Sequence, residues 1–154
     1  MYYAKYNNGS IYRAGMDVSS PSSLVTGLSR PYHIAIDFQN SRLYWTCEGD
    51  STVQSSTMDG AEIRTIAKRS SASKTFGIGL SRGNLYWTNY GTRTLESSTM
   101  TGQDIQILHA SESNLRRLTV VPRLDLPRNR SNDCAGLTCS KICVLSPSSF
   151  NCLT

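Results

Sequence analysis

Residues 43–53 read LYWTCEGDSTV, and residues 85–95 read LYWTNYGTRTL. The shared Leu-Tyr-Trp-Thr sets Tyr44 and Tyr86 42 positions apart, and a Ser-Ser-Thr-Met stretch after each copy returns at the same spacing. A further step of 42 back from Tyr44 reaches Tyr2, in a degenerate copy that reads MYYAKY. A fixed period of about 20–50 residues is typical of repeat proteins. The sequence therefore predicts three copies of one structural unit.

Each complete copy contains four short runs that are rich in aromatic and β-branched residues. In the second copy they read HIAID, LYWTC, STVQSSTM and EIRTIA, and in the third FGIGL, LYWTN, TLESSTM and DIQILH. Gly, Asn and Asp-Gly turns separate the runs, which are too short for helices. Four short antiparallel strands in about 40–45 residues are typical of a β-propeller blade. We expect an all-β fold, a β-propeller with three four-stranded repeats in residues 1–126.

The tryptophan of each complete copy is predicted to be a core residue. Trp45 and Trp87 are large apolar plates in the second strand of their blades, where each would pack against the neighbouring blade. Tyr3 takes this position in the first copy, so its packing should be weaker. We assign these aromatic residues no ligand.

Composition and charge exclude several classes of function. The 154 residues carry a net charge of +5, and 38% of them are hydrophobic. No run approaches the roughly 20 apolar residues of a transmembrane segment, and the first ten residues have no apolar stretch typical of a signal peptide. Aromatic residues for base stacking are absent from the basic stretch between Leu115 and Asn132, so we expect no nucleic acid partner.

Four of the five cysteines lie close together near the end of the chain, and Cys47 stands apart. The clustered residues are Cys134, Cys139, Cys143 and Cys152. Such a cluster in a loop-rich segment predicts disulfides and hence a secreted or extracellular protein. A metal site is the competing interpretation, but the segment lacks histidine and paired Cys-x2-Cys spacing. We therefore expect disulfides and no metal. For Cys47, a buried unpaired thiol competes with an intermolecular bridge.

The motif LYWT, preceded by PYHIAID and followed by MDG, resembles the YWTD repeats of the low-density-lipoprotein receptor family. LRRLTVVPRLDLP resembles the strand that completes the family's propeller, and SNDCAGLTCSKICVLSPSSFNC resembles a truncated EGF-like module. The resemblance implies a propeller in residues 1–126, then a linker and partial EGF-like module in 127–154. It also implies the pairs Cys134–Cys143 and Cys139–Cys152, whereas four cysteines alone allow three connectivities.

The aspartate of the family's motif is missing from all three copies, where Lys5, Cys47 and Asn89 stand instead. In the family this residue helps to lock a strand and a loop by hydrogen bonds. Asn89 can replace it in part, and Cys47 only poorly. The resemblance therefore implies a propeller less stable than is usual in the family.

Three repeats are half of the six-bladed ring that the resemblance implies. The first copy starts at a second strand, and the last inner strand, Leu118 to Val121, has no blade of its own. A homodimer would close the ring if this strand of each chain completed the first blade of the other. The alternatives are a fragment of a longer receptor and a monomer that closes with three blades.

The resemblance implies a non-enzymatic recognition module, with no cofactor, that binds a protein ligand through one propeller face. The loops that join strands two and three, and strands four and one, build that face. Tyr and Arg are frequent hot-spot residues, so Tyr90 and Arg93 lead the candidates. The others are Asn7, Asn8, Arg30, Tyr32, Glu48, Asp50, Arg69, Lys74 and Arg116.

Two other functions and one modification stay open at this point. The arginines near 116 and 117 suit an anionic polysaccharide or a bacterial surface polyanion. A calcium-dependent propeller hydrolase is more remote, because His33 and Asp37 on the inner strands are too few hard ligands, so we assign no catalytic residue. Asn8 and Asn129 head glycosylation sequons, although Asn8-Gly9 equally predicts a tight hairpin turn.

Overall fold

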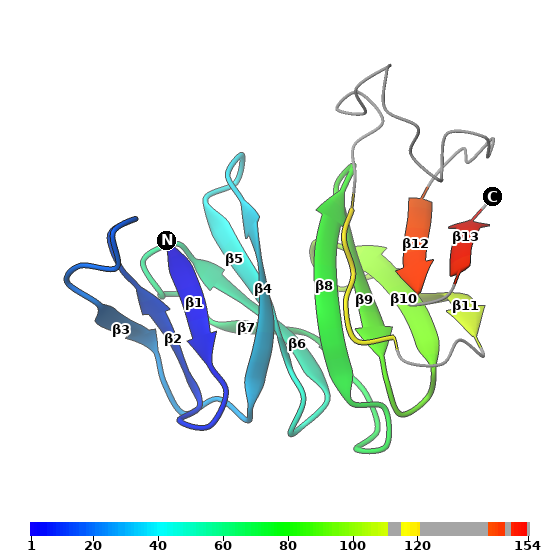
Figure 1. Ribbon diagram of the computed structural model, residues 1–154, viewed down its shortest axis with the longest axis horizontal. Helices are drawn as coiled ribbons and strands as arrows, with labels where there is room; N and C mark the ends of the chain where they lie inside the picture. Colours follow the sequence, from blue (N-terminus) through cyan, green and yellow to red (C-terminus); the bar gives the residue numbers. More distant parts are fainter. Residues whose placement is uncertain (111–114, 121–141, 147–148, 154) are drawn as a thin grey trace.

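The computed structural model describes residues 1–110, 115–120, 142–146 and 149–153. In these residues the strands form four antiparallel sheets (Figure 1). The first sheet contains β1 (Tyr2–Lys5), β2 (Ser10–Arg13) and β3 (Ser22–Val25). The second contains β4 (Pro31–Asp37), β5 (Arg42–Cys47), β6 (Thr52–Thr57) and β7 (Arg64–Lys68). The third contains β8 (Thr75–Ser81), β9 (Asn84–Asn89), β10 (Thr94–Thr99) and β11 (Gln106–Ala110), and the fourth β12 (Ile142–Ser146) and β13 (Ser149–Leu153).

The first three sheets are the predicted blades, and they confirm the β-propeller fold. Each has its strands in sequence order, and the sheets stand side by side in Figure 1. The first described sheet has three strands rather than four, because the first copy contributes no strand before β1. The second and third sheets have the full four.

The repeat extends to the details of strand pairing. In the second blade Tyr44 lies opposite Ser55, and in the third Tyr86 lies opposite Ser97, again 42 residues on. All three blades carry a register shift at one equivalent point, which falls at Ile11/Tyr12, Val53/Gln54 and Leu95/Glu96. A bulge sharpens the local twist of a strand. The blades therefore share their distortion as well as their order of strands.

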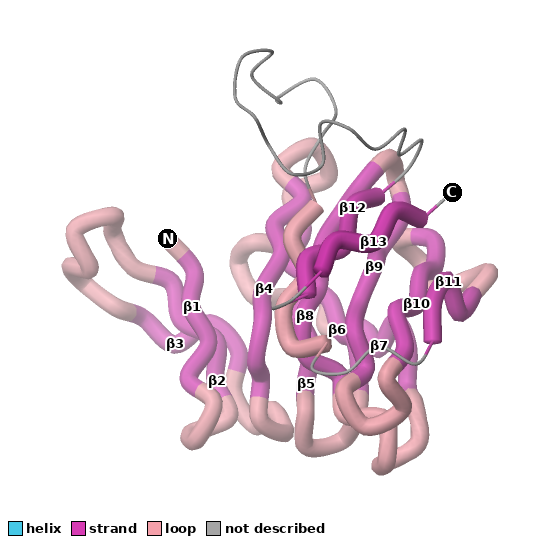
Figure 2. The backbone as a smooth tube through the Cα atoms, turned by 45° about the vertical axis from the view of Figure 1, so that its right-hand side comes forward, coloured by secondary structure: helices cyan, strands magenta, loops and turns pink. Residues whose placement is uncertain are grey.

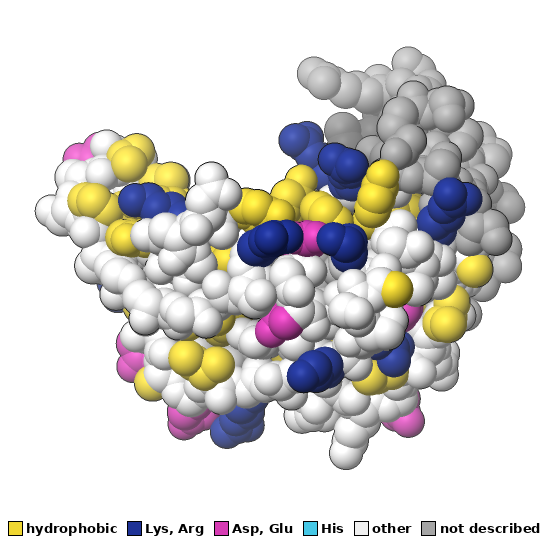
Figure 3. All heavy atoms as spheres, turned by 90° about the horizontal axis from the view of Figure 1, so that it is seen from below, with side chains coloured by type: hydrophobic (Ala, Val, Ile, Leu, Met, Phe, Trp, Pro, Cys, Tyr) yellow, Lys and Arg dark blue, Asp and Glu magenta, His cyan; other side chains and the backbone are white. Residues whose placement is uncertain are grey.

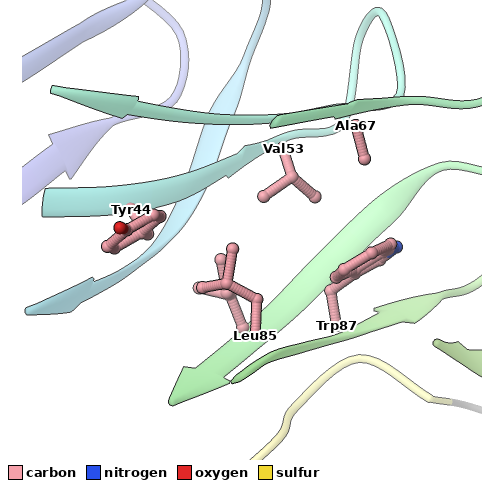
Figure 4. Close-up of a cluster of buried hydrophobic side chains, with 6 residues drawn as sticks. Tyr44, Val53, Ala67, Leu85 and Trp87 are labelled. Atoms are coloured by element: carbon pink, nitrogen blue, oxygen red, sulfur yellow. The ribbon is translucent and has the colours of Figure 1, made fainter. Parts of the chain in front are cut away.

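The core lies between blades, as predicted from the tryptophans. Trp87 is fully buried against Tyr44, Val53 and Ala67 of the preceding blade (Figure 4). Trp45 is likewise fully buried, in a cluster between the first and second blades that includes Ile11. Burial of a large apolar side chain contributes about 1.5–3 kcal/mol. Much of the stability of each blade therefore comes from contact with its neighbour.

Residues 115–120 run beside β8, where the inner strand of a further blade would lie (Figure 1). A Cβ atom on Gly77 would lie 2.6 Å from the backbone nitrogen of Leu118, and one on Gly79 would lie 2.6 Å from Cγ2 of Val120. These two glycines thus let the segment approach β8 closely. Within the described residues no strand pairs with this segment.

The cysteines are only partly described. Cys47 is fully buried and has no disulfide partner among the described residues, so its burial is as predicted. The register of β12 and β13 sets Cys143 opposite Cys152. Cys134, Cys139, Asn129 and the predicted domain boundary at 126/127 lie outside the described residues, so the disulfides and the EGF-like module stay predictions. Across the described ranges, no helix is long and apolar enough to cross a membrane.

Candidate functional site

The predicted ligand face lies at the end of the blades where β1, β5 and β9 finish and β4 and β8 begin. Figure 2 shows the loops of this end below the strands. Figure 3 looks onto it, and near its centre basic side chains flank an acidic one, directly beside a group of hydrophobic side chains. The sequence places these loops on one face because every blade repeats the same up-and-down order of strands.

Glu48 forms the hub of this face. Its carboxylate accepts hydrogen bonds from Lys74 Nζ at 2.7 Å, Arg30 Nη1 at 3.2 Å and the Tyr6 hydroxyl at 2.9 Å. The side chain of Glu48 is only 5% exposed. The bond from Lys74, with smaller contributions from Tyr6 and Arg30, lowers the pKa of Glu48. Glu48 was predicted as a ligand contact, but the structure commits its carboxylate to three partners from three different segments of the chain.

Arg30 and Lys74 occupy equivalent places in successive copies, each directly before an inner strand. Both have left-handed backbones, with φ of 55° and 52°. The carbonyl of Arg30 accepts the N–H of Glu48 at 3.0 Å, and the carbonyl of Lys74 accepts the N–H of Tyr90 at 2.9 Å. Glu48 and Tyr90 are therefore equivalent residues as well. This repeated geometry brings both basic side chains to the one carboxylate.

Four aromatic rings cross the face in a row, which we call the aromatic row: Tyr6, Tyr32, Phe76 and Tyr90. Successive ring centroids lie 6.3, 4.6 and 5.7 Å apart, and each pair meets edge to face. The guanidinium carbon of Arg116 lies 4.6 Å from the centroid of Tyr90 and 5.9 Å from that of Phe76. Contact with Arg116 also lowers the pKa of Tyr90. Tyr6 and Tyr32 remain 38% and 40% exposed, so the row can contact a partner.

The structure brings most of the predicted ligand residues together. The residues gathered around the hub and the row are Arg30, Tyr32, Glu48, Lys74, Tyr90 and Arg116. Their roles as ligand contacts stay predictions.

Three of the remaining predicted ligand residues, Asp50, Arg69 and Arg93, have different surroundings. Arg69 donates from Nε to Glu96 at 2.6 Å, and Asp50 accepts from Thr52 at 2.9 Å. Arg93 is exposed in the β9–β10 loop, near enough for its charge to affect Tyr90.

Sequence reasoning missed two members of the aromatic row. Tyr6 lies 42 residues before Glu48, and Phe76 lies 44 residues after Tyr32, so both occupy places equivalent to predicted residues. An alignment of each inner strand by its own spacing, rather than by the single period of 42, would have found Phe76. The Tyr6–Glu48 bond joins two blades and has no local signal.

His33 lies on the inner strand β4 and has a structural role. Its Nδ1 accepts the N–H of Ile78 on β8 at 3.1 Å, a bond between two blades. Burial, followed by the charge of Arg117, lowers its pKa. Among the residues that the structure describes, no group of three or more His, Cys, Asp or Glu side chains is placed to hold a metal ion.

Asn8 lies in the turn between β1 and β2, which confirms the predicted hairpin. Gly9 has a φ of 64°, and a Cβ atom there would lie 2.3 Å from the carbonyl oxygen of Leu28, so only glycine fits. Asn8 is exposed, whereas Ser10 is 4% exposed and bonds back to the carbonyl of Asn8 at 3.2 Å. Glycosylation at Asn8 or Asn129 stays a prediction.

Comparison with solved structures supports the assignment to the β-propeller fold. A chain in the crystal structure of a nidogen/laminin complex is 28% identical, with a TM-score of 0.65 over 71% of this chain. Virginiamycin B lyase from Staphylococcus aureus, with selenomethionine, is 19% identical, with a TM-score of 0.59 over 69% of this chain. The chain spans 43% and 36% of these structures' lengths. At its lower identity the lyase carries information on the fold alone. No family model and no curated protein matches the sequence.

The protein is therefore a β-propeller, with two complete blades and one three-stranded blade in its described residues. The more similar of the two structures comes from a complex between proteins.

Proposed function

We propose that this chain is a non-enzymatic, extracellular recognition module of the YWTD type that binds a protein ligand through the face of the aromatic row. The row itself carries the proposal, because it places four contiguous rings on one face beside exposed basic groups. Aromatic residues and arginine are enriched in protein interfaces and dominate their energetics. The likeness to a chain from the nidogen/laminin complex adds support.

The hub gives the face a preorganised shape. Glu48 ties Tyr6, Arg30 and Lys74 to one point, so these side chains lose little freedom when a ligand binds. Ordering a side chain at an interface costs about 0.5–1.5 kcal/mol, and a residue that is already held avoids part of this cost. In this proposal Glu48 positions the contact residues, and the rings provide the contact area.

The proposal includes a homodimer that closes the ring. The segment 115–120 lies in the place of an inner strand without a strand partner among the described residues, and β1 is the inner edge of its sheet. Exchange of this segment between two chains would pair both edges around a twofold axis. Light scattering after gel filtration, without reductant, should give twice the chain's 17.0 kDa. The mass of a single chain would contradict the dimer without affecting the binding face.

An anionic polysaccharide is the second candidate ligand. Arg116 and Arg117 are both exposed at the edge of the same face, and the chain carries a net charge of +5. A polyanion would bind through charge alone, so its affinity should fall steeply with salt and respond little to loss of a ring. A protein ligand should respond to both.

The experiment measures binding of the full chain to purified extracellular matrix proteins by surface plasmon resonance, with laminin as the first probe. Tyr90→Ala removes a ring from the row, and we expect its Kd to rise by roughly tenfold or more. Phe38→Ala is the matched control, because Phe38 is 77% exposed in the β4–β5 turn at the opposite end of the blade. The proposal is wrong if no protein of the panel binds saturably, or if the two variants behave alike.

A further inference from the structure

Arg116 has no carboxylate partner in the part of the chain that the structure describes. Five ion pairs occur there, and none of them includes Arg116. Its guanidinium is instead held against the rings of Tyr90 and Phe76, at 4.6 Å and 5.9 Å from their centroids. A guanidinium on an aromatic ring keeps its N–H edge available for a carboxylate. The group is thus fixed in place, exposed and ready to donate.

The repeat shows what is missing beside Arg116. Arg30 and Lys74 stand directly before β4 and β8, and Glu48 and Tyr90 are the equivalent residues that donate to their carbonyls. Between Arg30 and Lys74 lies Glu48, which bonds to both at 3.2 Å and 2.7 Å. In the next blade the residue equivalent to Glu48 is Tyr90, which lies beside Arg116 and brings no negative charge. The place beside Arg116 therefore holds a ring where the preceding blade has a carboxylate.

We propose that Arg116 anchors an Asp or Glu side chain from an acidic segment of the protein partner. The incoming carboxylate pairs with Arg116, with Arg117 next to it on the same segment. This inference rests on the proposed function, because it specifies the chemistry of the ligand on the same face.

The surroundings of Arg116 favour an acidic protein segment over a sulfated glycan. Phe76 and Tyr90 lie beside the guanidinium, so an apolar side chain next to the acidic residue has a surface to contact. Charge-assisted pairs between arginine and carboxylate are short and commonly bidentate. Contact with the rings would exclude water and strengthen the pair, and exclusion of water is typical of interface hot spots.

The test selects peptides of about a dozen random residues, displayed on phage, on the immobilised full chain. We expect the selected sequences to be enriched in Asp or Glu next to an apolar or aromatic residue. One selected peptide and its copy with Asn or Gln at the acidic positions are then titrated. We expect the neutral copy to bind roughly tenfold more weakly or worse.

Matched variants test whether the carboxylate of the peptide pairs with Arg116. Arg116→Gln should weaken the acidic peptide by about the same factor and leave the neutral copy unchanged. Arg82→Gln makes the same change of charge in the exposed β8–β9 turn, at the opposite end of the blade, and should bind like the unmodified chain. Tyr90→Glu places an internal carboxylate beside Arg116 and should also weaken the acidic peptide. Far-ultraviolet circular dichroism checks that each variant is folded.

Several results would overturn the inference. They are selection of no peptide, selection of peptides without acidic residues, or equal binding of the acidic peptide to the Arg116→Gln and Arg82→Gln variants. Binding of a heparin oligosaccharide without binding of acidic peptides would overturn it in favour of the polysaccharide. A protein ligand that is lost on Tyr90→Ala but kept on Arg116→Gln would leave the proposed function standing and remove only this inference.

Discussion

Glu48 and Tyr90 occupy equivalent positions in successive blades, and their side chains make different contacts there. Each donates its backbone N–H to the carbonyl of the basic residue before an inner strand, Arg30 at 3.0 Å and Lys74 at 2.9 Å. The buried carboxylate of Glu48 then binds the partly exposed side chains of Arg30 and Lys74, whereas the ring of Tyr90 contacts Arg116. The same backbone position thus carries an ion cluster in the second blade and, in the third, a ring beside an exposed cation.

Removal of the charge at the hub should destabilise the protein. Glu48→Gln weakens the bonds from Lys74 and Arg30, and we expect the free energy of unfolding at neutral pH to fall by about 1–2 kcal/mol. Urea unfolding followed by circular dichroism measures it. Glu62→Gln is the matched control, because Glu62 is 57% exposed and its ion pairs lie on the surface, where such pairs contribute little. Equal effects of the two substitutions would contradict the hub.

The contribution of Glu48 should also depend on pH in the acidic range. Because its pKa is lowered in the folded state, its contribution is present above the unfolded-state pKa of about 4.3 and is lost as the pH falls below it. We expect unmodified protein and Glu48→Gln to differ in unfolding free energy at about pH 7 and to converge at about pH 3. A difference that stays constant across this range would be inconsistent with the lowered pKa.

His33 predicts a separate loss of stability at milder pH. Its lowered pKa means that the folded state disfavours the protonated ring, so stability is full above the unfolded-state pKa of about 6.5 and declines below it. Protonation of Nδ1 also removes the bond from Ile78, at a cost of about 1 kcal/mol. Thermal unfolding between about pH 7 and about pH 5 measures the decline.

His33→Gln is the control for this titration, since an amide oxygen can accept the same N–H without taking up a proton. His109 is present in both proteins, so the difference between them isolates His33. If the two proteins lose stability in parallel over this range, His33 is not the responsible group.

The two tryptophans should differ in their tolerance of phenylalanine. Trp45 Nε1 donates to Gln54 at 3.2 Å, whereas Trp87 Nε1 is buried without a partner among the described residues. The residue equivalent to Gln54 is Glu96, which is engaged by Arg69 instead. Trp45→Phe loses a hydrogen bond and leaves the amide oxygen of Gln54 without this donor. Trp87→Phe instead removes a donor that has no described acceptor. We expect Trp45→Phe to cost about 1 kcal/mol more in unfolding free energy, measured in urea. Equal costs would show that the hydrogen bond contributes nothing.

The thiol of Cys47 should be unreactive in the folded chain. Burial raises its pKa to about 11, so the thiolate that attacks disulfide reagents is scarce, and the sulfur has no access to solvent. We expect no reaction with Ellman's reagent in the native protein and rapid reaction in concentrated guanidinium chloride. Reaction of the native chain at the unfolded rate would contradict the burial.

The same assay counts the disulfides that the sequence predicts. Without reductant, the denatured chain should release one thiol, from Cys47, because the other four cysteines are expected to be paired. Five thiols per chain would show that the predicted framework is wrong. Peptide mapping then distinguishes the pairs Cys134–Cys143 and Cys139–Cys152 from the alternatives.

The sequence by itself determined the blades and their core. Strand order and the burial of Trp45 and Trp87 follow from local patterns: runs of β-forming residues, Gly and Asn turns, and a period of 42 residues. These patterns can be recognised in the sequence because each strand of a blade pairs with the strand next to it along the chain. The resemblance to the YWTD repeats then pointed to the loops of the predicted ligand face, and hence to Tyr90 and Arg116.

Only the tertiary structure decided how the members of that face are connected. The bond from Tyr6 to Glu48 spans 42 residues, and Arg116 reaches Phe76 from a segment 40 residues away. Neither contact has a local pattern, because each depends on how one blade rotates against the next. The three partners of Glu48, a predicted ligand residue, come from three segments of the chain for the same reason. Packing between blades, rather than the chemistry of single residues, separates the groups that hold the face together from those left open to a partner.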